Sequence, residues 1–290
     1  MNETSLRAIA LEKGTDKEGA HSYTDAYERH LGRLRGEPIT LLEIGIGGYA
    51  DPGRGGASLR MWKEYFPSAR IIGLDIEDKS GLAEDRITIL RGNQGDRAFL
   101  GRIALEHGPF DVVIDDGSHR CKHVIATFEG LFPHLTANGT YVIEDLQTSY
   151  WETYGGSSGP DRRGTSMTML QSLVDGLNHA EFDIPLYEPI YTDQWVRSVT
   201  FYHNLAFIQK GPNLEPSHLL PPHPRETRRF AKPPATKARI AKGGAAKALA
   251  SRSPRRIFRS VVPLPIRRAA VDLARTLRRP TGSGGPGPSG

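Results

Sequence analysis

The chain has 290 residues, 38% of them hydrophobic, and its 38 lysines and arginines outnumber its 33 aspartates and glutamates. This length is enough to bury at least one full core. The single cysteine, Cys121, excludes an internal disulfide and a multi-cysteine zinc cluster. The amino-terminal residues lack the pattern of a signal peptide, and no apolar run approaches the roughly 18 residues that span a bilayer. We therefore expect a cytoplasmic protein.

The positive charge is concentrated near the carboxyl end. Residues 212–290 contain 17 Lys and Arg against 3 Asp and Glu, a local charge of +14, whereas residues 1–211 carry −9. The segment 212–290 is rich in Pro, Gly and Ala, and we predict that it is largely disordered, with a short amphipathic helix near 266–279. A basic helix of this kind could associate weakly with an anionic membrane surface. Binding of the segment to nucleic acid is the less favoured interpretation. Residues 1–211 are then the folded domain.

Short apolar runs alternate with segments of helical length in the first half of this domain. The predicted strands cover 39–46, 69–76, 87–92, 110–117 and 140–145. The predicted helices cover 24–34, 58–66, 97–107 and 123–135. This alternation predicts an α/β fold: a doubly wound, Rossmann-like sheet of five parallel strands with helices on both faces.

The second half of the domain departs from this alternation. A glycine-rich loop with Trp151 and Tyr154 is followed by a predicted helix at about 167–180. Two late strands, near 196–202 and 205–209, are predicted to form an antiparallel hairpin that closes one edge of the sheet. The loop could fold over a site as an aromatic wall or be an ordinary surface loop, and the sequence leaves both open.

Polar residues follow the first two strands, where ligands of an open α/β sheet bind. Glycines at 45, 47 and 48 would let a ligand approach the backbone, and Asp75 is placed to accept hydrogen bonds from ribose hydroxyls. The stretch formally satisfies G-x-G-x-x-A, so a nicotinamide cofactor has to be considered. However, residues 51–56 intervene before the next helix, whereas a pyrophosphate needs a helix amino terminus close to the glycines. A cofactor without phosphates therefore fits better.

Three carboxylates follow the fourth and fifth strands. We expect Asp116, Glu144 and Asp145 to converge, because these two strands are neighbours in the predicted topology. Carboxylates held together repel each other unless a cation lies among them, and Mg²⁺ with oxygen ligands is the economical answer. The alternative is that some of them cap helices or accept backbone N–H bonds, and Glu144 and Asp145 point to opposite faces if the strand runs straight.

A histidine follows the first of these carboxylates at a short spacing. His119 lies three residues after Asp116, where it could remove a proton from a hydroxyl whose pKa a metal lowers. His123, one helical turn further on, is the rival for this role. Cys121 lies between the two histidines, and we interpret it as a small buried or semi-buried residue because one thiol and two histidines make a poor zinc site.

These motifs occur in the order of a known family. They are GTDK (14–17), LEIGIGGYADPGRGGASLRMWKEYFP (42–67), GLDI (73–76), GNQ (92–94), DDGSH (115–119) and IEDLQTSYW (143–151). The ordered set resembles the class I S-adenosylmethionine (SAM) methyltransferases. It more closely resembles the magnesium-dependent macrolide and antibiotic-sugar O-methyltransferases, the family of the mycinamicin, tylosin and elloramycin sugar enzymes.

The resemblance implies a SAM-dependent methyltransferase domain over residues 1–211 and a hydroxyl acceptor on a sugar or glycosylated natural product, such as a macrolide, a polyketide glycoside or a glycolipid. The implied SAM-binding residues are Thr15, Glu43, Gly45, Gly47, Tyr49, Ser58, Asp75, Asn93, Gln94 and Asp116. It also implies Mg²⁺ at Asp116, Glu144 and Asp145 and a catalytic base at His119. The chain has no counterpart of the long amino-terminal auxiliary domain of some members, which leaves a homo-oligomer open.

Two other functions are compatible with the same residues. The acceptor could be a catechol or a polyketide phenol, which needs less help from a base. The chain could also be chiefly a binding protein whose basic tail engages membrane or nucleic acid.

Overall fold

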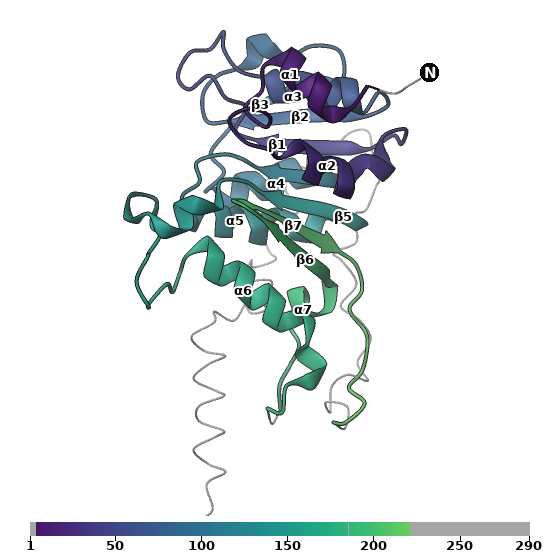
Figure 1. Ribbon diagram of the computed structural model, residues 1–290, viewed down its shortest axis with the longest axis vertical. Coiled ribbons are helices and arrows are strands. Elements are labelled where there is room, and N and C mark those ends of the chain that lie inside the picture. Colours follow the sequence, from purple (N-terminus) through teal and green to yellow (C-terminus); the bar gives the residue numbers. More distant parts are fainter. Residues whose placement is uncertain (1–3, 185, 221–290) are drawn as a thin grey trace, which may run out of the picture.

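The computed structural model describes residues 4–184 and 186–220 (Figure 1). Its helices are α1 (Leu6–Lys13), α2 (Thr24–Leu31), α3 (Ala57–Tyr65), α4 (Arg97–His107), α5 (Cys121–Leu131), α6 (Ser166–Leu177) and α7 (Tyr191–Trp195). Its strands are β1 (Thr40–Ile44), β2 (Arg70–Asp75), β3 (Ile87–Arg91), β4 (Phe110–Asp115), β5 (Leu135–Ile143), β6 (Val196–Tyr202) and β7 (Leu205–Lys210). The helix expected near 266–279 and the rest of the chain beyond residue 220 lie outside the described residues.

One sheet organises the described chain. Its strand order is β3-β2-β1-β4-β5-β7-β6, and Figure 1 shows the sheet with β3 and β2 at the top and β6 at the opposite edge. β1 to β5 are parallel, whereas β7 pairs antiparallel with β5 and β6 pairs antiparallel with β7. The predicted Rossmann-like sheet of five parallel strands with a carboxyl-terminal hairpin is confirmed. None of the described helices is both long and apolar enough to cross a membrane.

The two faces of the sheet carry separate hydrophobic cores. Helices α1, α2 and α3 cover one face, where they pack on Leu41, Ile71 and Val112. Helices α4, α5 and α6 cover the other face, where Leu42 and Val113 lie among their packing partners. Neighbouring residues of a strand therefore enter different cores, as the period of two requires. This alternation also decides on which face each polar residue at a strand end lies.

The prediction for the fifth strand was wrong at both ends. β5 begins at Leu135, which pairs with Phe110, rather than near residue 140. Residues 136–139 have a polar, glycine-containing composition that indicates a turn; they are assigned to β5, but the register against β4 shifts across them, from Phe110↔Leu135 to Val112↔Thr140. β5 also ends at Ile143, so Glu144 and Asp145 lie beyond the strand. Asp145, with its left-handed backbone, therefore does not follow the strict alternation of a straight strand. The short helix α7 was not predicted.

Lys210, at the end of β7, is buried, and among the described residues its ammonium has backbone carbonyls rather than a carboxylate as acceptors. Its ammonium donates to the carbonyls of Pro133 at 2.9 Å and Leu135 at 2.8 Å. The rings of Phe132, Tyr191 and Trp195 surround it at 5.7 to 5.9 Å. Burial lowers the pKa of Lys210 to about 8. Because an exposed lysine has a pKa of about 10.4, the unfolded chain holds this proton over a pH range in which the folded chain releases it.

The free energy of unfolding should therefore rise with pH through Lys210. Between pH 8 and about 10.4 the unfolded state binds more protons, so this residue contributes a slope of up to about 1.4 kcal/mol per pH unit. Urea unfolding at a series of pH values, with Lys210→Met as the comparison, measures the contribution. The Met variant should lose this part of the slope. Equal slopes in both proteins over that range would contradict the lowered pKa.

Candidate active site

A buried lysine lies among three carboxylates at the carboxyl edge of the sheet. Lys17 Nζ is 3.1 Å from Glu43 Oε1, 2.8 Å from Asp116 Oδ2 and 2.6 Å from Glu144 Oε1. The Lys17 side chain is completely inaccessible to solvent. The hydroxyl of Tyr27, on α2, also donates to Glu144 Oε1. One ammonium thus links the ends of β1, β4 and β5.

The alternation of the strands explains this meeting. Residues an even number of positions apart on a strand point to the same face of the sheet. Glu43, Asp116 and Glu144 therefore share a face with Leu41, Val112 and Val142, which belong to the core beneath α1–α3. Lys17 lies in the connection between α1 and α2, on the same side of the sheet.

The ion pairs determine the protonation of this cluster. Burial acts to lower the pKa of Lys17, but the carboxylates of Asp116, Glu144 and Glu43 together outweigh it and hold that pKa well above its ordinary value. Burial raises the pKa of each carboxyl group, and Lys17 opposes that rise. The lysine therefore remains charged.

Lys17 was missed as a site residue by the sequence reasoning, although it lies within the GTDK motif. The sequence indicated that converging carboxylates need a cation, and we expected a metal ion in that place. In the structure an ammonium meets part of this need.

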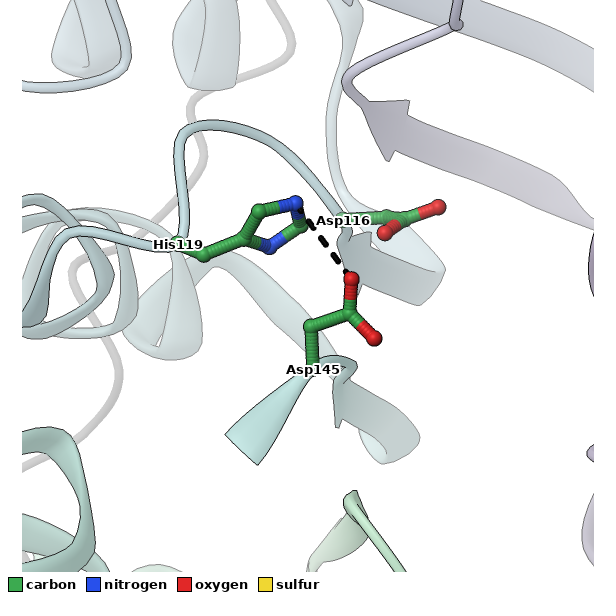
Figure 2. A group of neighbouring side chains, drawn as sticks. All are labelled: Asp116, His119 and Asp145. Carbon is green, nitrogen blue, oxygen red and sulfur yellow. Dashed lines mark ion pairs between the residues drawn. The ribbon is translucent and has the colours of Figure 1, made fainter. Parts of the chain in front are cut away.

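A second group forms beside the lysine, from Asp116, His119 and Asp145 (Figure 2). One ligand atom from each residue lies within 4.8 Å of the others, and His119 Nε2 is 3.5 Å from Asp145 Oδ2. Figure 2 shows the imidazole facing the Asp145 carboxylate, with Asp116 beside them. His119 and Asp145 both adopt a left-handed backbone conformation, with φ of 54°. Asp145 turns into this group because β5 has already ended.

Of the three metal ligands expected from the sequence, the structure brings together Asp116 and Asp145. Glu144 lies on the other side of Asp116, where Lys17 and Tyr27 bind its Oε1. The donor set of Asp116, His119 and Asp145 fits a divalent cation, because two carboxylates and an imidazole each offer a ligand atom within 4.8 Å of the others, although Asp116 Oδ2 also contacts Lys17 Nζ at 2.8 Å.

Further side chains surround Asp145. The Gln147 amide donates to its Oδ1 at 3.1 Å, and the Tyr23 hydroxyl does so at 3.4 Å. His21 Nε2 is 3.6 Å from the same oxygen, and its ring stacks on Tyr23 with centroids 4.5 Å apart. The Asp145 carboxylate thus lies between two histidines, His119 on one oxygen and His21 on the other. His21 was not among the predicted site residues.

The rival histidine does not join this group. His123 Nδ1 is 2.7 Å from Ser118 Oγ, and burial lowers the pKa of His123. Cys121 is buried, as expected, with its thiol 3.7 Å from Ser166 Oγ. In the loop that follows the site, Trp151 is about half exposed and its ring lies 5.9 Å from that of Tyr154. Of the two predicted candidates for the base, the geometry favours His119.

The glycine-rich turn packs directly on this group. Gly45 has φ of 81°, and a Cβ there would meet the carbonyl oxygen of Asp116 at 2.1 Å, so only glycine fits. Gly47 also has a positive φ, and the nearest atom to a Cβ would be 3.9 Å away, which leaves room for a ligand. The loop then closes on itself: the Gly56 N–H donates to the Ile46 carbonyl at 2.6 Å. Helix α3 begins only at Ala57, as the sequence predicted.

A second buried lysine holds this loop in shape. Lys79 Nζ donates to the carbonyl of Asp51 and, at 2.9 Å, to that of Arg54. Lys79 is fully buried and was not predicted as part of the site. Tyr49, at the top of the loop, is 95% exposed and therefore accessible to a ligand.

Asp75 is held at the end of β2 with acceptor capacity to spare. Its two oxygens accept the N–H groups of Ile46 at 3.2 Å and Glu77 at 2.9 Å. Each carboxylate oxygen can accept a further hydrogen bond, so a pair of ribose hydroxyls can be bound here. Ser58, at the start of α3, lies beside Glu43 and stabilises its charged form.

Three predicted cofactor residues make hydrogen bonds within the chain: Gln94 and Thr15, which are buried, and Asn93, which is exposed. The Gln94 amide donates to Asp115 Oδ1 at 2.9 Å, and its carbonyl accepts the Ser118 N–H at 2.6 Å. Asn93 Oδ1 accepts the Gly95 N–H at 2.8 Å. Thr15 is buried, and its hydroxyl is 3.5 Å from the Lys17 N–H. These residues shape the loops of the site through bonds within the chain.

Several known proteins are similar to this chain in sequence. No family model matches the chain. An 8-demethyl-8-α-L-rhamnosyl tetracenomycin-C 2′-O-methyltransferase from Streptomyces olivaceus is 48% identical over 209 residues, 72% of this chain and 55% of the relative. Mycinamicin VI 2″-O-methyltransferase from Micromonospora griseorubida is 48% identical over 197 residues, 67% of this chain and 49% of the relative. Demethylmacrocin O-methyltransferase from Streptomyces fradiae is 48% identical over 217 residues, 74% and 54% of the two chains.

A solved structure gives the same result. MycE, a methyltransferase of the mycinamycin pathway in complex with Mg, S-adenosylhomocysteine (SAH) and mycinamycin VI, matches with a TM-score of 0.72 and 44% identity, over 76% of this chain and 57% of that one. The chain spans about half the length of the curated relatives it matches. By sequence and by fold, the chain is thus similar to about half of each of these macrolide and glycoside sugar O-methyltransferases.

Proposed function

We propose that the chain is a SAM- and Mg²⁺-dependent O-methyltransferase that methylates a hydroxyl on the sugar of a glycosylated small molecule. The observation that carries this proposal is the contact between two parts of the site. The glycine turn at Gly45 packs on the carbonyl of Asp116, whose side chain belongs to the group with His119 and Asp145. A cofactor on the turn and an acceptor at the group would therefore be neighbours.

The cofactor would bind along the turn after β1. Gly45, Gly47 and Tyr49 would provide the surface, and Asp75 would accept bonds from the ribose hydroxyls. The remaining residues that we assign to the cofactor site, directly or by shaping it, are Thr15, Glu43, Ser58, Asn93, Gln94 and Asp116. The unit would extend over residues 1–211, and we place its reaction in the cytoplasm, where a lone thiol such as Cys121 stays reduced.

The acceptor hydroxyl would react beside His119. Asp116 and Asp145, with Glu144 behind them, would hold Mg²⁺, which when bound lowers the pKa of an oxygen that it contacts. His119 Nε2 would remove the hydroxyl proton as a new C–O bond forms to the methyl carbon and its bond to sulfur breaks, which releases SAH. Asp145, 3.5 Å from this nitrogen, would stabilise the resulting imidazolium. The same residues would also hold the acceptor hydroxyl in line with the methyl group, and orienting two reactants in this way contributes much of the rate acceleration.

A calorimetric titration tests this proposal. SAM, SAH and NAD⁺ are each added to the full chain, with Mg²⁺ and then with EDTA. Binding of the first two without the third is expected, and binding of NAD⁺ alone would overturn the proposal. Methyl transfer to a rhamnosylated polyketide, compared with transfer to a catechol, then identifies the acceptor class. EDTA should abolish transfer and added Mg²⁺ restore it; activity indifferent to EDTA would exclude the metal.

A further inference from the structure

The side chain of Thr148 lies between the backbones of the two residues that present the catalytic group. Its hydroxyl oxygen is 3.1 Å from the carbonyl oxygen of His119 and 2.7 Å from that of Asp145. Thr148 belongs to a short 3-10 helix, Leu146–Tyr150, that begins directly after Asp145. It is 5% exposed, so water has little access to this contact.

The two contacts have different origins. A threonine hydroxyl often bonds to the carbonyl three residues earlier in a helical turn, so the contact with Asp145 is local. The contact with His119 joins residues 29 positions apart, and it ties the loop after β4 to the turn after β5. A hydroxyl has one proton, so the carbonyl oxygens of His119 and Asp145 compete for the single hydrogen bond that Thr148 can donate.

Both carbonyls belong to residues in an uncommon conformation. His119 and Asp145 each have φ of 54°, a region that residues other than glycine seldom adopt. Such a conformation persists when the surrounding structure holds it in place. The side-chain direction of each residue depends on it, because a rotation about φ or ψ would move the imidazole and the carboxylate apart.

We propose that Thr148 is a positioning residue that sets the placement of His119 relative to Asp145. The inference rests on the proposed methyltransferase function, in which His119 would act on the acceptor hydroxyl and Asp145 would help to hold Mg²⁺. The Thr148 hydroxyl bonds to the backbone carbonyls of His119 and Asp145, so it acts on their side chains through the backbone. Its loss should disturb acceptor chemistry and metal binding, but it should not disturb SAM, which binds along the turn after β1.

Thr148→Val tests this role, because valine has nearly the same shape but no hydroxyl. We expect kcat to fall about tenfold or more, since small displacements of reacting groups have effects of this size. The affinity for Mn²⁺, measured by electron paramagnetic resonance without substrate, should fall several-fold. The dissociation constant of SAM should stay within about twofold of the wild-type value. Thr148→Ser retains the hydroxyl and should restore both kcat and Mn²⁺ affinity.

Thr168→Val is the matched control, because its hydroxyl also lies between two carbonyls, those of Arg162 and Thr165. Thr168→Val should change neither kcat nor Mn²⁺ affinity. If the wild-type chain binds SAM and transfers methyl groups, an unchanged kcat and Mn²⁺ affinity in Thr148→Val overturn the positioning role and leave the function standing. A wild-type chain that does not bind SAM overturns the function itself. If Thr148→Val does not fold, as SAM titration reveals, Thr148→Ala repeats the comparison with Thr148→Ser.

Discussion

Replacing Lys17 with methionine is expected to lower the free energy of unfolding by about 3–5 kcal/mol, because it leaves buried carboxylates without their cation. Three carboxylates depend on this ammonium, and Lys17, Glu43 and Glu144 are almost completely buried. Methionine fills a similar volume, so the loss would come from charge rather than from a cavity. Urea unfolding followed by circular dichroism measures the difference.

Lys13→Met provides the control for this experiment. Lys13 also pairs with two carboxylates, Glu12 at 2.9 Å and Glu64 at 2.7 Å, but these pairs lie at the surface. Exposed ion pairs contribute about 1 kcal/mol or less. If Lys17→Met were no more destabilising than Lys13→Met, the buried pairs would not matter for stability.

A double variant separates charge from packing. Glu144→Gln added to Lys17→Met removes one of the uncompensated carboxylates and should recover part of the lost stability. The two changes should therefore be non-additive, as expected of residues in direct contact. Additive effects would mean that Lys17 and Glu144 stabilise the fold independently of each other.

The alternation of apolar runs and helical segments predicted the sheet, because each strand buried on both faces leaves a continuous apolar signature. The same pattern located the functional edge, since ligands bind where such strands end. It also predicted that Asp116, Glu144 and Asp145 converge near His119, and the structure brings Asp116 and Asp145 together with His119 while Glu144 bonds to Lys17 and Tyr27. The predictions that succeeded depend on local sequence and on general topology.

The contacts made by Lys17, His21 and Thr148 could not be predicted in this way. Lys17 reaches carboxylates that are up to 127 positions away in sequence, and no local pattern carries that information. His21 meets Asp145 only because the connection between α1 and α2 folds over the edge of the sheet. The motifs contained Lys17 and Thr148, but motif matching alone gives no partners.

The end of β5 is a different case. An apolar run that leads into Glu144 and Asp145 looks like a strand that continues to residue 145. The chain leaves the sheet at Ile143, and the left-handed conformation of Asp145 turns its carboxylate toward His119. Nothing in the identity of residue 145 requires this turn, although aspartate tolerates it better than most residues.

Replacing His119 with asparagine is expected to lower kcat by about 10²- to 10⁴-fold, the usual contribution of a general base. Asparagine tolerates the left-handed backbone that His119 adopts but cannot accept the hydroxyl proton. The affinity for SAM should not change, because the cofactor would bind on the other side of Asp116. Steady-state kinetics and calorimetry measure the two quantities.

His123→Asn is the control, since His123 lies on the same segment but bonds to Ser118 instead of facing Asp145. It should leave kcat within a few-fold of the wild-type value. The Mn²⁺ affinity of His119→Asn then separates the two roles that the geometry allows. A base leaves this affinity nearly intact, whereas a metal ligand loses it together with kcat. An unchanged kcat would remove His119 from the mechanism and favour a phenolic acceptor, because a more acidic hydroxyl ionises without the help of a base.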